Sequence, residues 1–286
     1  MTFFRRVVTY GRMIKFSHSL FALPFAMTAV VFASRERPVT FRQVVWIVVA
    51  MVGTRSAAMG FNRLVDRTID AANPRTWNRE LPRGILTSRS ASVFVAVSSA
   101  LLILAASQLN RLCLLLSPVA LGIVFFYSYT KRFTWTSHLF LGLALGIAPT
   151  GAWIAVMGGF GLPPFLLGFA VLTWVAGFDV IYACQDYHFD RRYGLSSIPQ
   201  TIGVGKALLA ARFFHVVTFV SLIGLKFVLG LGSVYTIGLI VVAGILIYEH
   251  RLVRAGDLSK LNVAFFNMNG ILSLLYFAFA LGDILL

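Results

Sequence analysis

The chain has 286 residues, of which 58% are hydrophobic and 12% are charged, and its mean hydropathy is +0.83. This composition excludes an ordinary soluble domain. A net charge of +15 would also suit a nucleic-acid partner, but basic loops are the usual orientation signal of multi-span membrane proteins and contact anionic lipids. We therefore expect an integral membrane protein that contacts membrane lipid and binds no nucleic acid.

Apolar stretches long enough to cross a bilayer, about 17–25 residues each, recur along the whole chain. Nine candidates lie at residues 17–34, 43–61, 91–108, 112–129, 137–157, 163–183, 207–230, 233–250 and 263–283. The first candidate is longer than the hydrophobic region of a signal peptide and has no clear small-x-small cleavage site, so we do not expect it to be a cleaved signal. Because no Pro/Ser-rich linker or low-complexity run interrupts the series, we predict one all-α domain over residues 1–286, a bundle of about nine transmembrane helices around a central cavity open to the cytoplasmic face.

Basic residues are unevenly divided between the two sides of such a bundle. If the loops alternate, 20 of the 25 Lys and Arg lie in the N-terminal segment and in every second loop, and the other 5 lie on the opposite side. Cytoplasmic loops of membrane proteins carry such an excess. We therefore expect a multi-pass protein of the inner (plasma) membrane with a cytoplasmic N-terminus and an external C-terminus.

Five of the ten acidic residues fall in two short stretches, after the second and the sixth predicted span. The residues of interest are Asn62, Asp66 and Asp70 in the first stretch and Asp179, Asp186 and Asp190 in the second. A spacing of four places side chains on one face of a helix. Carboxylates crowded beside apolar sequence are costly unless they share a cation. Each stretch is therefore expected to hold a short column of carboxylates that binds a cation.

The donor atoms of these columns are all oxygens, which suits a hard cation such as Mg²⁺. Mg²⁺ held by one or two carboxylates usually completes its shell with waters and substrate phosphates. Asp66 and Asp186 are 120 residues apart, as are Asp70 and Asp190. That separation equals four helices, an even number, so the two segments run parallel and could face each other across one cavity. The pattern predicts a membrane enzyme that binds a lipid diphosphate.

Cations follow both the first acidic stretch and the fourth span. Arg75 and Arg79 come directly after the Asp column, and guanidinium forks bind phosphate oxygens well. Their other interpretation is a loop orientation signal. Lys131 and Arg132 lie in a short loop on the side of the membrane where the acidic stretches are expected. Lys131 could contact phosphate and Arg132 an acidic co-substrate, or both could be snorkelling anchors.

Three further side chains are candidates for the reaction itself or for substrate binding. Asp179, Tyr182 and Asp186 share a helical face, with Asp179 deeper in the span. An intramembrane acid is a functional candidate by default, although it could also pair structurally with a buried Arg or Asn. His18 lies near the expected cavity, where a His is more often a satisfied packing residue.

These motifs resemble those of the UbiA superfamily of membrane prenyltransferases over essentially the whole chain. The stretch 62–84, with its Asn-Pro-Arg-Thr and Arg-Glu-Leu-Pro-Arg-Gly sequences, resembles the first aspartate-rich motif, and 179–199 resembles the second. Residues 127–132 resemble the Tyr-x-x-x-Lys-Arg loop, and 15–25 resemble the opening of the first helix. Many members carry Asp directly after the motif Asn, whereas this chain has Arg63, so no metal ligand is expected there.

The resemblance implies transfer of a polyprenyl group from an isoprenyl diphosphate to an aromatic acid in ubiquinone or menaquinone biosynthesis. Within the superfamily, the motif sequences resemble those of the 4-hydroxybenzoate polyprenyltransferase-like group. The alternative is a hydroxynaphthoate prenyltransferase of a menaquinone route. Two Mg²⁺, held by the two acidic stretches, would clamp the diphosphate. The roles implied are Asp179 and Tyr182 catalytic, Asn62, Asp66, Asp70, Asp186 and Asp190 metal-binding, and Arg75, Arg79, Lys131, Arg132 and His18 substrate-binding.

Two other functions fit parts of the pattern. An ion- or proton-coupled transporter would use acids near the bilayer midplane, in helices broken by Gly or Pro. Here the acids run into Arg-rich loops, and neither 62–70 nor 179–190 contains Gly or Pro. A sibling transferase acting on haem or chlorophyll precursors would stay within the superfamily. The prenyltransferase is the function we expect.

Overall fold

The computed structural model describes residues 3–14 and 21–286, with side chains from residue 8 onward in the first segment. Apart from turns and one isolated bridge between Arg254 and Asp257, the described residues form helices. Eight of the helical segments in this part are long and apolar enough to cross a membrane. They are α3 (Phe41–Val65), α5 (Ser88–Leu109), α6 (Arg111–Thr130), α7 (Ser137–Met157), α8 (Leu162–Ala183, continuing to Tyr193), α11 (Val204–Leu229), α12 (Ser233–Leu252) and η3 (Val263–Met268) with α13 (Asn269–Leu285).

The first predicted span, 17–34, is only partly covered by the described residues. Its described part is α2 (Leu23–Ala33), which has 11 residues, whereas crossing the hydrocarbon core takes about 20. Residues 17–20 of that span lie outside the described residues. The all-α membrane bundle is therefore confirmed, while the expected count of nine spans is not.

Capping side chains or proline mark the starts of several long helices. Thr40 and Gln43 form a reciprocal capping box at the start of α3, which satisfies backbone N–H groups that a helix leaves unpaired. Asn110 caps α6 by accepting from the Cys113 N–H at 2.9 Å. Proline in the first turn of α8 needs no N–H donor there.

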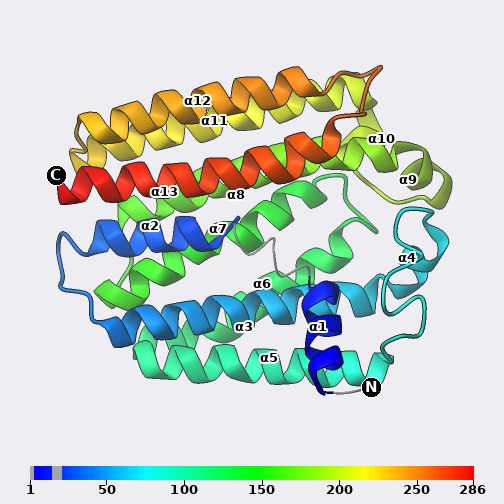
Figure 1. The fold of residues 1–286 in the computed structure, drawn as a ribbon, viewed down its shortest axis with the longest axis horizontal. Helices are drawn as coiled ribbons and strands as arrows, with labels where there is room; N and C mark the ends of the chain where they lie inside the picture. Colours follow the sequence, from blue (N-terminus) through cyan, green and yellow to red (C-terminus); the bar gives the residue numbers. More distant parts are fainter. Residues whose placement is uncertain (1–2, 15–20) are drawn as a thin grey trace.

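The helices lie side by side and leave their connecting elements at the two ends of the bundle (Figure 1). In that view α11 and α12 lie at the top, α3 and α5 at the bottom, and α2 and α7 between them. The short helices α4 (Arg67–Ala72), α9 (Tyr187–Tyr193) and α10 (Ile198–Ile202) gather at one end, and the C-terminus lies at the other. The helix α1 (Phe3–Met13) crosses the long helices and packs on α5, where Tyr10 stacks on Phe94.

Glycines bring α7 and α8 unusually close together. A Cβ added to Gly146 would lie 2.6 Å from the Gly168 carbonyl oxygen, and one added to Gly168 would lie 2.7 Å from that of Gly146. Such contacts are tolerated only without side chains, a packing mode common between membrane helices. Gly142 makes a similar close approach to the Leu172 carbonyl. The order of these contacts is antiparallel, so the start of α7 lies beside the end of α8, where Asp179 is found.

Buried polar contacts join α8 to the last two long helices. The Trp174 indole N–H donates to Asn269 Oδ1 at 2.7 Å, and the Asn269 amide donates to Glu249 Oε1 at 3.1 Å. All three side chains are fully buried. These bonds tie α8, α12 and α13 together, although the second carboxyl oxygen of Glu249 has no hydrogen-bond partner among the described residues. The neighbouring η3, which ends beside Asn269, carries the Phe265 that stacks on Tyr182.

Candidate active site

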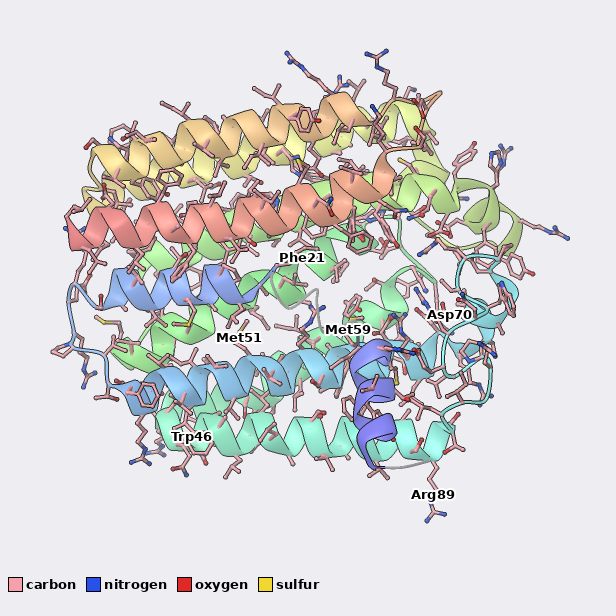
Figure 2. All side chains as sticks on the ribbon, in the orientation of Figure 1. Phe21, Trp46, Met51, Met59, Asp70 and Arg89 are labelled. Atoms are coloured by element: carbon pink, nitrogen blue, oxygen red, sulfur yellow. The ribbon has the colours of Figure 1, made fainter. Side chains whose placement is uncertain are left out.

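A cavity of about 500 Å³ runs into the bundle from the end that carries α4 and α9. Every acidic residue singled out from the sequence lines it, together with Asn62, Tyr182 and three of the four predicted phosphate or substrate cations, Arg75, Arg79 and Lys131. Figure 2 shows Asp70 beside α4 at the charged end, with Met59, Met51 and Phe21 further inside. The two acidic stretches therefore meet at one cavity.

Both stretches depart from the continuous helical column that their spacing predicted. α3 ends at Val65 and α8 at Ala183, so that the first acid of each pair stands at a helix junction. Asp66 has φ −89° and ψ 4°, and Asp186 has φ −93° and ψ 3°. The second acid of each pair lies in the short helix that follows. The same break at equivalent positions turns both acid pairs along the cavity end rather than down one helix face.

Each acid of the first stretch is held by a cation. The Lys131 ammonium bonds Asp66 Oδ2, and the Asn62 amide donates to the same oxygen at 3.1 Å. Arg79 Nη1 lies 2.7 Å from both oxygens of Asp70. The side chains of Asp66 and Asp70 are 3% and 7% exposed, and buried carboxylates need such partners.

Arg63, which replaces an acid found in many members of the resembling superfamily, also faces Asp70. Its Nη1 lies 3.9 Å from Asp70 Oδ2, and its Nε donates to the Met13 carbonyl at 3.2 Å. The side chain is buried. This position therefore supplies a cation beside Asp70 and a link to the end of α1.

Arg75 joins the two acidic stretches. Its Nε donates to Asp186 Oδ1 at 3.1 Å, its Nη2 bonds Asp186 Oδ2, and its Nη1 donates to the Tyr182 hydroxyl at 3.0 Å. Asn73 adds a bond to Asp186 Oδ1 at 3.2 Å. Burial lowers the pKa of the Arg75 guanidinium, but its hydrogen bonds and attraction to Asp186 outweigh that effect and raise the pKa above its ordinary value.

Asp190 and Asp179 bond a hydroxyl and an imidazole rather than a Lys or Arg side chain. Ser197, which caps α10, donates its hydroxyl to Asp190 Oδ2 at 2.9 Å. His138, near the start of α7, places Nδ1 2.7 Å from Asp179 Oδ2. The structural alternative for Asp179, a buried Arg or Asn partner, is therefore not what the described residues show.

One substrate-binding prediction, Arg132, does not line the cavity, and another, His18, is not covered by the described residues. Arg132 is absent from the lining, and its Nη2 donates to the Val65 carbonyl at 2.7 Å and lies 3.4 Å from Asp66 Oδ1. It holds the helix junction rather than facing the cavity. His18 lies outside the described residues.

Four lining residues escaped the sequence reasoning: Asn73, His138, Ser197 and the α3 residue Arg55. Asn73 and Ser197 belong to the quoted motifs but carry no spacing signal of their own. Arg55 lies seven residues before Asn62, two turns down the same helix, which could have marked it as a cavity cation. His138 meets Asp179 only through the packing of α7 on α8.

The remaining wall is mostly apolar, with Arg55 as its one cation among the described residues. Along α3 it reaches from Asn62 back to Ile47, a distance of about 22 Å at 1.5 Å per residue. Leu102 and Ala106 of α5 and Leu116 of α6 continue it. Aromatic rings lie nearer the charged end, where Phe178 and Phe265 line the cavity beside Tyr182. Such a wall suits a long hydrocarbon chain better than a hydrated ion path.

The donor set at the charged end fits Mg²⁺ only as part of a larger shell. Within the described residues, no group of three or more His, Cys, Asp or Glu side chains surrounds a common point. The four candidate ligand aspartates, Asp66, Asp70, Asp186 and Asp190, instead offer oxygens in twos. Mg²⁺ accepts this arrangement when waters and phosphate oxygens complete its octahedron.

These features define a multi-pass helical membrane protein whose largely apolar cavity ends in pairs of carboxylates with Lys or Arg side chains. A model of the UbiA prenyltransferase family matches residues 22–271. The chain belongs to the UbiA prenyltransferase family, and it is a membrane prenyltransferase.

Relatives and solved structures agree with this assignment. The 4-hydroxybenzoate octaprenyltransferase of Nitrosospira multiformis is 31% identical over 230 residues, 78% of each chain. That of Paraburkholderia phymatum is 30% identical over 272 residues, 93% of each chain. The structure of a UbiA homologue from Aeropyrum pernix superposes with a TM-score of 0.85 at 34% identity, covering 93% of this chain and 98% of that one. A homologue from Archaeoglobus fulgidus bound to GPP and Mg²⁺ shares the fold, with a TM-score of 0.72 at 19% identity over 97% and 100% of the two chains.

Proposed function

We propose that this prenyltransferase moves a polyprenyl group from an isoprenyl diphosphate to an aromatic acid, in a Mg²⁺-dependent reaction of ubiquinone or menaquinone biosynthesis. The observation that carries the proposal is the single cavity whose one end is charged and whose walls are apolar. The relatives named for 4-hydroxybenzoate favour that acceptor. A hydroxynaphthoate, a larger ring with the same carboxyl and hydroxyl groups, is the second candidate.

The charged pairs explain how the diphosphate is held. In the structure Arg75, Arg79 and Lys131 pair with Asp186, Asp70 and Asp66 respectively. When substrate binds, we expect these carboxylates to turn to Mg²⁺ and the freed cations to turn to phosphate oxygens. Bound Mg²⁺ would neutralise charge on the leaving diphosphate. The three cations would stabilise the same developing charge in the transition state.

The reaction then breaks two bonds and forms two. The bond between prenyl C1 and the diphosphate oxygen breaks, and its electron pair leaves with diphosphate. The acceptor carbon ortho to the phenolic hydroxyl forms a new bond to C1, and its proton passes to the Asp179 carboxylate. The Tyr182 ring stacks on Phe265 with centroids 4.0 Å apart, and the Arg75 guanidinium lies over it, 5.1 Å from its centroid. Once Arg75 turns to phosphate oxygens, the ring would offer an aromatic face to the allylic cation.

The acceptor carboxylate needs a cation inside the cavity, because a bare charge in apolar surroundings is costly. Arg132 was expected to supply it but faces Val65 instead. Arg55 lines the cavity from α3, two helical turns before Asn62 and among mostly apolar side chains. Its guanidinium can bind a carboxylate bidentately. We therefore assign the acceptor carboxylate to Arg55.

Membranes containing the protein, Mg²⁺, a polyprenyl diphosphate and a panel of labelled aromatic acids test the function directly. We expect prenylated 4-hydroxybenzoate or hydroxynaphthoate, loss of product in EDTA and recovery with Mg²⁺. Full activity in the chelator would remove the metal from the mechanism, and no product with any acid would refute the acceptor class.

The same assay separates the two arginines. Arg55→Gln should raise KM for the aromatic acid at least about tenfold while leaving KM for the diphosphate near normal, since lost uniform binding appears in KM. Arg132→Gln is the matched control and should affect both substrates alike. A selective effect of Arg132→Gln on the acid would instead restore the assignment made from the sequence.

The two sides of the membrane are also assigned. We propose that α4, α9 and the charged cavity end face the cytoplasm, as the excess of basic residues in these loops indicates. The C-terminus lies at the opposite end of the bundle (Figure 1), so it would be external.

A further inference from the structure

We propose that His138 is a positioning residue, which holds the Asp179 carboxylate turned to receive the proton released by the acceptor carbon. The proposal rests on the proposed function, in which Asp179 is the base. His138 lines the cavity at the second residue of α7, and its side chain is 4% exposed, against 24% for Asp179. It therefore stands behind Asp179, which remains reachable from the cavity.

The two ring nitrogens of His138 have different partners, and these partners fix where its proton lies. Nε2 is 3.2 Å from the backbone N–H of Ile198, which can only donate. Nε2 must therefore be the unprotonated nitrogen, and the neutral ring carries its proton on Nδ1. That proton is donated to Asp179 Oδ2 across 2.7 Å.

This tautomer makes His138 a donor to the base rather than a relay for its proton. A second proton on the ring would set Nε2–H against the Ile198 N–H, two donors facing each other. The ring therefore keeps its single proton while Asp179 takes the one released by the acceptor carbon. From there the proton leaves to water at the charged end or to the departing diphosphate. What His138 contributes is the orientation of the carboxylate.

The anchor of His138 also belongs to the second acidic stretch. Ile198 follows Ser197, whose hydroxyl holds Asp190, and the neighbouring Ser196 N–H donates to the Lys131 carbonyl at 2.7 Å. The ring thus connects the base to the loop that places a candidate ligand aspartate. Its own position is set by the close packing of α7 on α8.

Two substitutions separate the two bonds of the ring. In His138→Asn the side-chain amide falls near the position of Nδ1 and can still donate to Asp179. In His138→Gln the longer amide reaches the position of Nε2, keeping Ile198 but losing the donor to Asp179. We expect kcat to stay within about threefold in the Asn variant and to fall about 10–100-fold in the Gln variant, as loss of an outer-shell partner does.

A purely structural His138 predicts the reverse order, because Gln keeps the link between α7 and the α10 loop. KM for the polyprenyl diphosphate should be unchanged in both variants. His188→Asn, at an exposed position of α9, is the control and should match the wild type. Equal kcat losses in the two variants, or a greater loss with Asn, would overturn the proposal.

Two further readouts test it without relying on the size of kcat. With 4-hydroxybenzoate deuterated ortho to the hydroxyl, the isotope effect on kcat should be larger in His138→Gln than in the wild type, because proton removal becomes slower. An unchanged isotope effect contradicts a role at the base.

Nitrogen-15 NMR of histidine-labelled protein reads the tautomer directly. The signal lost in His138→Asn should show a protonated Nδ1 and should change in Asp179→Asn. A protonated Nε2 would refute the proposal. If wild-type membranes transferred no prenyl group, the proposed function would fail, while this spectrum would still decide the His138–Asp179 geometry.

Discussion

Arg75 offers the sharpest test of the charged cavity end, because it is a cation from the first acidic stretch that bonds both Asp186 and Tyr182 of the second. Its side chain is 32% exposed and that of Asp186 is 15% exposed. A hydrogen bond to a charged group contributes roughly 1.5–3 kcal/mol. Arg75→Lys keeps the charge but loses the fork, equivalent to about one such bond. We therefore expect kcat/KM for the diphosphate to fall about 10–100-fold.

Removing the charge as well should cost more. Arg75→Gln loses two charged bonds to the phosphate, so kcat/KM should fall about 10²–10⁴-fold. The matched control is Arg83→Gln, eight residues further along the same loop and exposed, which should stay within about threefold. The assay is transfer from a polyprenyl diphosphate in membranes, with the protein level measured by immunoblot. Normal turnover by Arg75→Gln, or an equal loss in Arg83→Gln, would refute a phosphate role.

Two other expectations concern the metal ligands and the topology. Alanine at any one of the four candidate ligand aspartates should lower the rate at least about 10²-fold with the membrane level of protein near normal; near-wild-type turnover in two or more of them contradicts the two-metal site. In a protein without Cys113 and Cys184, a cysteine at exposed position 78 should be labelled from the cytoplasm and one at exposed position 160 from outside. The reverse pattern would invert the proposed orientation.

Hydropathy carried most of the fold prediction because membrane helices must satisfy every backbone group internally. It leaves the first span undecided, since the apolar run around α2 gives an 11-residue helix in the described residues and residues 17–20 lie outside them. Composition alone does not say where an apolar helix stops. It also did not predict the two helix junctions at Asp66 and Asp186, which contain neither Gly nor Pro.

The acids of the site were readable because charges are rare in this chain and therefore conspicuous. Their partners were less so. Arg132 and Lys131 are adjacent, yet Lys131 lines the cavity and Arg132 turns to a backbone carbonyl, a choice set by the local turn. His138 and Asp179 are 41 residues apart, and the close packing of α7 on α8 brings them together.

The ion pairs at the cavity end predict that Mg²⁺ and diphosphate bind cooperatively. Mg²⁺ alone would draw carboxylates away from Arg75, Arg79 and Lys131 and leave those cations without partners. Diphosphate alone would strand the carboxylates, and unpaired buried charges are strongly destabilising. Bound together, the two ligands satisfy both sets at once.

The coupling must be reciprocal, so calorimetry should show that inorganic pyrophosphate tightens Mg²⁺ binding and that Mg²⁺ tightens pyrophosphate binding by the same factor. Arg75→Gln should weaken this coupling, because one cation no longer needs a partner. Independent binding of the two ligands would show that the ion pairs remain intact in the complex.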